Sequence, residues 1–281
     1  MAEFRGRFNG LLVQEPLSKE AKYWLGFLFA DGCISYAGNY PRISVGIGSV
    51  DSQHMIDFAN FCGVESHAFN SPSTFGHYTG RQVRFAVTKE HAAKFASYGI
   101  VQRKSLREVP PAIFLNDVDW WRGVIDGDGS LAKYGRRGIN LQLCGSFATV
   151  QAFVQFVESV TGHLPGITKS DNGLCSAAAG GVRHSQMVLE KIYYKSCTPV
   201  LVRKLILAKS ALDWKSLDSH GENNSVARLT NAQAAAIRLD RHSCWMIAQK
   251  YNVSTSTIKN VKAGRTYTDT PKGNECQQID Q

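Results

Sequence analysis

One motif occurs twice in this chain, once in each half. The first copy, residues 23–32, reads YWLGFLFADG, and the second copy, residues 120–129, reads WWRGVIDGDG. Each copy has two aromatic residues, a glycine, an apolar stretch and a final Asp-Gly pair. Two copies are too few for a solenoid of stacked repeats. The duplication therefore predicts two similar halves that pack around a pseudo-twofold axis.

The segments after each copy also match. The motif is followed by a hairpin pattern whose second strand alternates between apolar and polar residues, at 42–47 in the first half and 139–143 in the second. Each half then shows a helical pattern, a weaker strand pair and a closing helix: 51–62, 82–88 and 89–98 in the first half, and 149–161, 167–169, 174–179 and 182–194 in the second. The pattern predicts an α+β fold of two αββαββα units.

The rest of the chain suggests a second, smaller domain. A terminal helix is expected near 199–217, followed by a polar linker at 218–225 that reads DSHGENNS. Helical patterns at 229–238, 244–251 and 254–263 then have the apolar spacing of a helix-turn-helix motif and resemble that family. The predicted domains are 15–108 and 109–217 for the two repeats, 218–225 for the linker, 226–267 for a helix-turn-helix domain and 268–281 for a tail.

Charge and composition limit the possible partners. The formal net charge is +9, which favours a polyanionic partner. Seven scattered cysteines without a Cys-x-x-Cys pair predict reduced thiols rather than a zinc site or a disulfide framework. No apolar stretch approaches the roughly 18 residues of a membrane helix, and residues 1–5 show no secretory signal. We expect an intracellular protein, cytoplasmic or organellar, with no membrane partner.

Both motif segments have the signals of a helix. Ser18 and Asp117 are suitable N-caps, and Gly32 and Gly129 suit a left-handed position that would end each helix. The Asp-Gly pair alone is a common helix-to-hairpin turn, and this is the alternative to a functional role. Its recurrence in two matching contexts favours a site.

Small residues four apart predict close packing of the two motif helices. Gly26 with Ala30, and Gly123 with Gly127, each form a small stripe on one helical face. Such stripes let two helix backbones approach closely, which would bring the aspartates that end the two motifs to the same end of the pair.

An acidic centre is therefore expected at Asp31 and Asp128. Two carboxylates near each other at the negative ends of helices repel, with a penalty on the order of 1 kcal/mol each. A divalent cation, Mg²⁺ or Mn²⁺, would relieve this repulsion, and Ala30 and Gly127 are assigned to the same metal site. The chemistry that fits is metal-assisted hydrolysis of phosphodiesters.

Segments 24–32 and 121–129 resemble the two motifs of the LAGLIDADG homing endonucleases. The resemblance covers about residues 15–215 and implies a monomer whose two β-sheet saddles lie in the major groove of double-stranded DNA. It implies a site-specific endonuclease that cuts across the minor groove, leaves 3′ overhangs and binds metal through Asp31 and Asp128. Phe29 departs from the family at the sixth motif position, where the second motif keeps Asp126. That position is not a metal ligand in the family.

The same resemblance implies a basic residue near the centre after the last helix of each unit. Lys104 and Lys204 fit this position, as catalytic residues that would orient water or offset phosphate charge. The alternative is a lysine that is solvated or that contacts a phosphate.

Two groups of residues are predicted to contact DNA. Arg, Asn and Gln can bind base edges, and exposed strand faces are also polar for simpler reasons. From the strands and the second hairpin, the candidates are Arg42, Ser44, Arg84, Lys133, Arg136, Arg137, Asn140 and Gln142. From the helix-turn-helix, they are Ser254, Thr255, Ser256, Lys259, Lys262 and Arg265.

Two other functions remain open. The chain could be a catalytically inactive DNA-binding regulator that combines the same two domains. It could also be an RNA maturase that acts on its own intron RNA. The presence of both Asp31 and Asp128 favours the nuclease over the inactive regulator.

Overall fold

The computed structural model describes residues 7–73, 76–133, 138–195, 197–213, 221–223 and 227–267. The chain forms two compact units, Met1–Trp214 and Lys215–Gln281. Among the described residues, none of the helices has both the length and the apolar character needed to cross a membrane.

The first unit contains two repeats with the same order of elements. The first repeat consists of α1 (Lys19–Asp31), β1 (Cys33–Ala37), β2 (Tyr40–Gly48), α2 (Ser52–Cys62), β3 (Ser66–Ser73), β4 (Gly76–Ala86) and α3 (Lys89–Ser97). The second consists of α4 (Val118–Asp128), β5 (Gly129–Lys133), β6 (Ile139–Gly145), α5 (Phe147–Thr161), β7 (Thr168–Lys169), β8 (Cys175–Ala178) and α6 (Val182–Ile192). Helix α7 (Val202–Asp213) follows, and short 3-10 turns lie at Ser49–Asp51 and Ala112–Phe114. The predicted α+β fold of two αββαββα units is confirmed.

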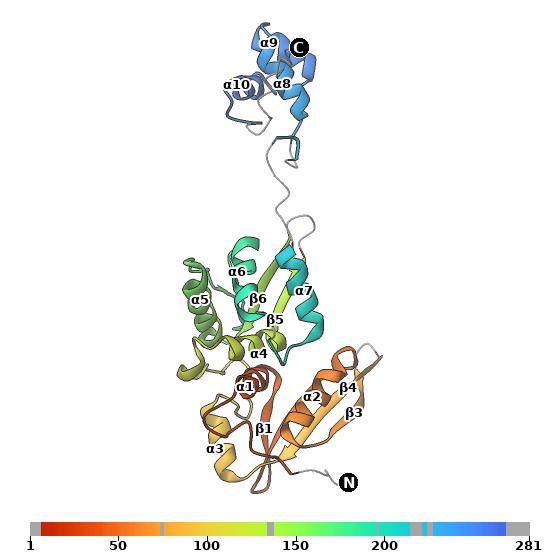
Figure 1. The fold of residues 1–281 in the computed structure, drawn as a ribbon, viewed down its shortest axis with the longest axis vertical. Coiled ribbons are helices and arrows are strands. Elements are labelled where there is room, and N and C mark those ends of the chain that lie inside the picture. The colour runs from red at the N-terminus through yellow and green to blue at the C-terminus, as the bar shows by residue number, and fades with distance from the viewer. Residues whose placement is uncertain are drawn as a thin grey trace, which may run out of the picture. The chain divides into compact units, whose positions relative to one another are not determined.

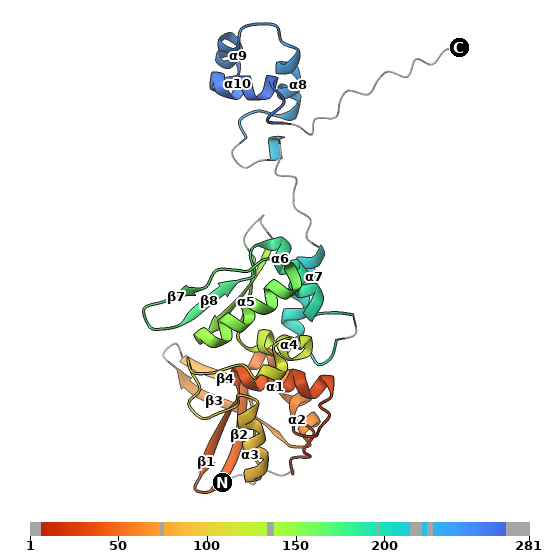
Figure 2. The ribbon, with the colours of Figure 1, turned by 90° about the vertical axis from the view of Figure 1, so that its left-hand side faces the viewer.

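Each repeat forms one four-stranded antiparallel sheet. The strand order is β1-β2-β4-β3 in the first sheet and β5-β6-β8-β7 in the second. Ile43 and Val45 in β2, and Leu141 and Leu143 in β6, are buried, as their alternation with polar residues predicts. Helices α2 and α3 pack on the first sheet, and α5 and α6 pack on the second (Figure 2). One face of each sheet is therefore core, and the other carries the polar side chains.

Helices α1 and α4 lie against each other at the centre of the first unit (Figure 1). The backbones touch at two glycines: a Cβ on Gly26 would lie 2.1 Å from the carbonyl oxygen of Trp120, and a Cβ on Gly123 would lie 2.0 Å from that of Tyr23. No larger residue fits at either place without moving a helix. The close approach predicted from the small-residue stripes is confirmed.

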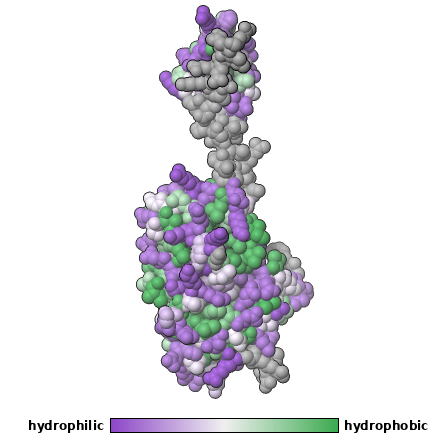
Figure 3. Space-filling model, viewed as in Figure 1, coloured by the Kyte–Doolittle hydropathy of each residue, from purple (hydrophilic) through white to green (hydrophobic). Residues whose placement is uncertain are grey.

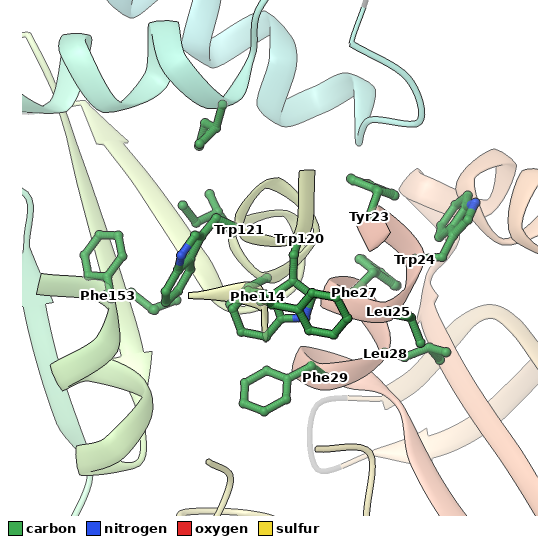
Figure 4. Packing of buried hydrophobic residues seen from close by; sticks show 14 of the residues in the cluster. Tyr23, Trp24, Leu25, Phe27, Leu28, Phe29, Phe114, Trp120, Trp121 and Phe153 are labelled. Carbon is green, nitrogen blue, oxygen red and sulfur yellow. The ribbon is translucent and has the colours of Figure 1, made fainter. Parts of the chain in front are cut away.

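Aromatic side chains from both repeats surround the helix pair (Figure 4). Trp120 stacks on Phe114, with ring centroids 5.7 Å apart, and contacts Phe29 of the first repeat at 5.1 Å. On the far side of α4, Trp121 packs against Phe153 and Phe156. The large rings thus join the two repeats into a single core.

On the molecular face drawn in Figure 3, apolar residues form patches among hydrophilic ones.

The ends of α1 and α4 are partly as predicted. Ser18 accepts a hydrogen bond from the amide of Ala21, and Asp117 accepts two from the first turn of α4, so both N-caps are confirmed. The left-handed conformation predicted for Gly32 and Gly129 is wrong, because their φ angles are −82° and −72°. Each helix leads directly into an extended strand. Glycine is needed there because a Cβ would lie 2.7 Å or less from a carbonyl oxygen one turn earlier.

The second unit is a bundle of three helices, α8 (Asn231–Leu239), α9 (Cys244–Tyr251) and α10 (Thr255–Lys262), with a short 3-10 turn at Gly221–Asn223. Thr230 and Gln233 form a capping box at the start of α8. Asn252 adopts a left-handed conformation between α9 and α10, with φ of 49°. The bundle has its own core, made of Leu229, Ala234, Ile237, Ile247, Ala248, Ile258, Val261 and Tyr267.

Candidate active site

Asp31 and Asp128 are the last residues of α1 and α4, and both side chains are exposed to solvent. The helix crossing brings them together. A Cβ added to Gly127, the neighbour of Asp128, would lie 3.2 Å from Oδ2 of Asp31 and 2.4 Å from the Cβ of Ala30. The carboxylate of Asp31 therefore reaches the end of the opposite helix. The small residue at position 127 provides the space for it.

The protein environment disfavours the ionised form of both acids. Partial desolvation by the surrounding protein raises the pKa of Asp128 to about 6, and the negative charge of Asp31 adds to this effect. Desolvation also raises the pKa of Asp31, against the lowering effect of the Lys104 and Lys204 charges. A cation bound between the two solvent-accessible carboxylates would favour their ionised form and so stabilise the protein.

Lys104 and Lys204 lie beside the acids, but their amines bind backbone carbonyls. The Nζ of Lys104 donates to the oxygens of Leu28 (3.0 Å), Phe29 and Ala30 (2.7 Å) at the end of α1. The Nζ of Lys204 donates to the oxygens of Ile125 (2.6 Å), Asp126 (2.8 Å), Gly127 (3.3 Å) and Gly129 (2.7 Å) at the end of α4. Each lysine thus binds carbonyls at the C-terminal end of one motif helix and offsets the negative end of the helix dipole.

Lys204 is buried and Lys104 is partly buried. Burial lowers the pKa of Lys104 to about 8 and also lowers that of Lys204, which is only 4% exposed. Ala30 and Gly127 were predicted to contact the metal. In the structure the backbone oxygen of each accepts a hydrogen bond from a lysine. The structure places all six predicted residues of the centre together, with the lysines on the helix ends.

A cavity of about 270 Å³ opens beside Asp128. Its lining consists of Ala30, Lys104, Ser105, Leu106, Glu108, Asp128, Cys144, Gly145 and Leu174. Glu108 is a residue that the motifs do not predict. Its carboxylate accepts a hydrogen bond from the amide of Ser146 at 2.8 Å, and its charge adds to the high pKa of Asp128. No sequence pattern links Glu108 to the motif helices, because the connection depends on the fold.

The donors at the centre fit a hard divalent cation. Both aspartates offer carboxylate oxygens, which Mg²⁺ prefers together with several retained waters. Within the described part of the chain, no three His, Cys, Asp or Glu side chains lie close enough to hold a metal ion together. The arrangement therefore suits a cation held by two carboxylates and water rather than a closed protein cage.

A second feature that the motifs do not predict is a buried polar network between the repeats. The Tyr23 hydroxyl donates to Asp126 at 2.7 Å and lies 2.9 Å from Nε2 of His54. Because the hydroxyl proton is used for Asp126, Nε2 of His54 must carry a proton and donate to Tyr23. Asp126 also accepts from the Tyr193 hydroxyl (2.5 Å) and the Leu201 amide (2.7 Å). The network fixes α1, α2 and α4 relative to each other.

The predicted DNA-contacting strand residues lie on the polar faces of the two sheets. Arg42, Ser44 and Arg84 share one face of the first sheet, because Ser44 pairs with Arg84 and Arg42 is two residues away in β2. Asn140 and Gln142 share the corresponding face of the second sheet, and Oδ1 of Asn140 accepts a hydrogen bond from Ser185. Lys133 ends β5, but its side chain, together with Arg136 and Arg137, lies outside the described residues.

The predicted contacts in the second unit fall into two groups. Thr255, Ser256, Lys259 and Arg265 are exposed on or just after α10. Two others have structural partners. Ser254 caps α10 by accepting from the Thr257 amide, and Nζ of Lys262 donates to the carbonyls of Asp240 and His242.

No family model matches this sequence, and no curated protein matches it significantly. Several solved structures are similar in fold. Full-length DUF199/WhiA from Thermatoga maritima matches with a TM-score of 0.44 and 15% identity, over 92% of this chain and 94% of that chain. The homing endonuclease I-WcaI bound to its DNA recognition sequence matches with a TM-score of 0.46 and 11% identity, over 66% and 85%. The meganuclease I-SmaMI bound to uncleaveable DNA matches with a TM-score of 0.42 and 13% identity, over 88% and 99%.

Proposed function

We propose that this chain is a site-specific double-stranded DNA endonuclease whose metal centre is formed by Asp31 and Asp128. The observation that carries the proposal is the meeting of these two exposed carboxylates at the ends of two helices packed at Gly26 and Gly123. When bound, Mg²⁺ or Mn²⁺ would acidify an attacking water and stabilise charge on the phosphate and the departing oxygen. The protein would act as a monomer, because one chain carries both halves, and would leave 3′ overhangs.

The residues around the centre have distinct roles in this proposal. Asp31 and Asp128 hold the cation. Lys104 and Lys204 act as positioning residues, because their amines neutralise the helix ends from which the two acids project. Without these positive charges, the two carboxylates would repel each other and the negative helix ends more strongly.

The strands support DNA as the substrate. The eight described strands contain no aspartate or glutamate, although the chain has 23 acidic residues. A surface free of negative charge suits a polyanion. The second unit would add a helix-turn-helix contact through α10, with exposed Thr255, Ser256 and Lys259 foremost.

The decisive experiment is a selection for cleaved sites from a random duplex library, followed by kinetics on the recovered site. The wild-type chain should cleave only with Mg²⁺ or Mn²⁺. Asp31→Asn and Asp128→Asn should each lower the cleavage rate by at least about a hundredfold, because several kcal/mol of charge stabilisation is lost. Binding measured without divalent cations should be largely unchanged. Asp57→Asn, the same change at an exposed position of α2, is the matched control and should cleave normally. Full cleavage by either centre variant would refute the assignment.

A catalytically inactive DNA-binding regulator is the second candidate. One observation favours it: both candidate catalytic lysines are bound to backbone carbonyls rather than directed at a substrate. In this case the chain would bind a specific duplex with the same affinity with or without Mg²⁺ and would nick no sequence in the library.

The contribution of the second unit can be tested separately. Deletion of residues 226–281 should weaken duplex binding and reduce the dependence of log Kd on log salt, because phosphate contacts release counterions. An unchanged salt slope would remove the second unit from the DNA contact.

A further inference from the structure

The polar faces of the two sheets differ in chemistry although their strand orders are identical. We call them the first polar face (Arg42, Ser44, Gly46, His67, Phe69, Gly80, Gln82 and Arg84) and the second polar face (Ser130, Asn140, Gln142, Cys144, Thr168, Ser176 and Ala178). The register of the strands places each set on the side opposite the buried core residues. Both faces start near the acidic centre: Ser44 pairs with Cys33, two residues after Asp31, and Gln142 pairs with Ser130, two residues after Asp128.

The first polar face carries two guanidinium groups. Arg84 pairs directly with Ser44, and Arg42 is the diagonal neighbour of Arg84 across the β2-β4 ladder. Within the described residues, neither arginine forms an ion pair with a carboxylate. Both positive charges therefore remain available to a partner.

An aromatic ring lies across the same face. A Cβ on Gly80 would lie 2.7 Å from the ring of Phe69, and a Cβ on Gly46 would lie 3.6 Å from it. The ring of Phe69 thus covers two glycines on neighbouring strands. This gives the first polar face an apolar surface beside its two arginines.

The second polar face has no charged side chain among its described members. Gln142 pairs with Ser130 and Ala178, and Ser176 pairs with Thr168. These small neighbours leave a cavity of about 360 Å³ lined by Asn140, Gln142, His163, Pro165, Gly166, Thr168, Ser176, Ala177, Ala178 and Gly180. Asn140 already uses its carbonyl oxygen to accept from Ser185. Gln142 is the amide better able to offer both its donor and its acceptor.

We infer that the two halves read chemically different half-sites: guanines under the first polar face, through Arg42 and Arg84, and an A·T-rich segment under the second, through Gln142. This inference rests on the proposed DNA-binding function and adds a base preference for each repeat. An arginine can donate two hydrogen bonds to O6 and N7 of guanine, whereas a glutamine can bind N6 and N7 of adenine. The small residues around Gln142 leave room for the methyl group of thymine, which apolar side chains such as Ala178 contact favourably. The pseudo-symmetric protein would therefore recognise a target without twofold symmetry.

The test is a binding selection with the full chain on a random duplex library, without divalent cations so that no strand is cut. The wild-type chain should recover a site with conserved G·C pairs in one half and A·T pairs in the other. Arg84→Gln should lower affinity for this site by about tenfold to a hundredfold and change the preference in the G·C half only. Gln142→Arg should change a preferred adenine to guanine in the other half only. Arg7→Gln, near the end of α2, makes the same charge change away from the face and should leave both halves unchanged.

The outcomes separate this inference from the function beneath it. A recovered site with the same base preference in both halves, or a preference unchanged by both Arg84→Gln and Gln142→Arg, overturns the half-site assignment and leaves DNA binding intact. Failure to enrich any duplex sequence overturns both the half-site assignment and the proposed DNA binding.

Discussion

The two repeats share one order of elements but fill the same motif position in opposite ways. In the first repeat the position holds Phe29, whose ring packs on Trp120 within the shared aromatic core. In the second it holds Asp126, which is 2% exposed and accepts hydrogen bonds from two tyrosine hydroxyls and a backbone amide. Burial raises the pKa of Asp126, and these three donors offset the cost of burying its charge.

The difference shows that the helix pair does not need symmetric side chains. What both repeats share is a glycine at the crossing, an aspartate at the end of the helix and a lysine that caps it. The positions between these can be apolar or polar, provided that a polar group finds its partners. Duplication thus preserves the backbone geometry of the centre, while each half is free to specialise.

The largest effect is expected where the repeats are most alike. Gly26→Ala and Gly123→Ala should each lower the free energy of unfolding by about 4 kcal/mol or more, because the new Cβ meets the backbone of the opposite helix. Urea unfolding would measure this. Gly166→Ala is the matched control, since a Cβ there meets no atom within 4 Å, and it should be nearly neutral. A well-tolerated alanine at either crossing position would show that the helices are not in contact there.

The next effect concerns the motif position that differs. Asp126→Ala should cost about 3 to 5 kcal/mol of stability, because two buried hydroxyls and the Leu201 amide lose their acceptor. Asp126→Asn keeps one acceptor oxygen and should cost about 1 kcal/mol. Phe29→Ala should cost about 3 to 5 kcal/mol through a cavity instead. Equal losses for the Ala and Asn variants at position 126 would mean that shape, and not hydrogen bonding, determines this position.

A smaller, pH-dependent effect should come from the first repeat through His54. Burial lowers the pKa of His54 to about 4, whereas an unfolded histidine titrates near about 6.5. Between these values the unfolded state binds a proton that the folded state does not, so stability is lost as pH falls, by at most about 3 kcal/mol. The loss in unfolding free energy between about pH 7 and about pH 4.5 should be larger for the wild type than for His54→Gln. Equal losses in the two proteins would contradict a buried neutral histidine.

The smallest effect should distinguish the two capping lysines. Lys204 is 4% exposed and bonds to four carbonyls, so Lys204→Met should cost about 2 kcal/mol. Lys104 is partly exposed and bonds to three, so Lys104→Met should cost about 1 kcal/mol. Lys209→Met, an exposed position on the same helix as Lys204, is the control. A reversed order would mean that burial does not determine the strength of these caps.

Much of the fold could be predicted because its signals are local. The duplicated motif, the alternation in β2 and β6, and the N-caps Ser18 and Asp117 each depend on a few neighbouring residues. Even the helix crossing could be predicted, because glycines at fixed spacing leave only one face where backbones can touch. The position of Asp31 and Asp128 at one end of the pair follows from this crossing.

Other features were decided by the tertiary structure alone. The lysine amines contact carbonyls more than seventy residues away in the sequence, and Tyr23 donates to Asp126 across the two repeats. The extended conformation of Gly32 and Gly129 follows from the strands they enter, and the ring of Phe69 covers two glycines of other strands. These contacts depend on where distant segments meet, and no local pattern in the sequence identifies these particular partners. The sequence alone determined the elements and the crossing of the two helices, whereas the hydrogen bonds, charges and shape of the centre depended on packing.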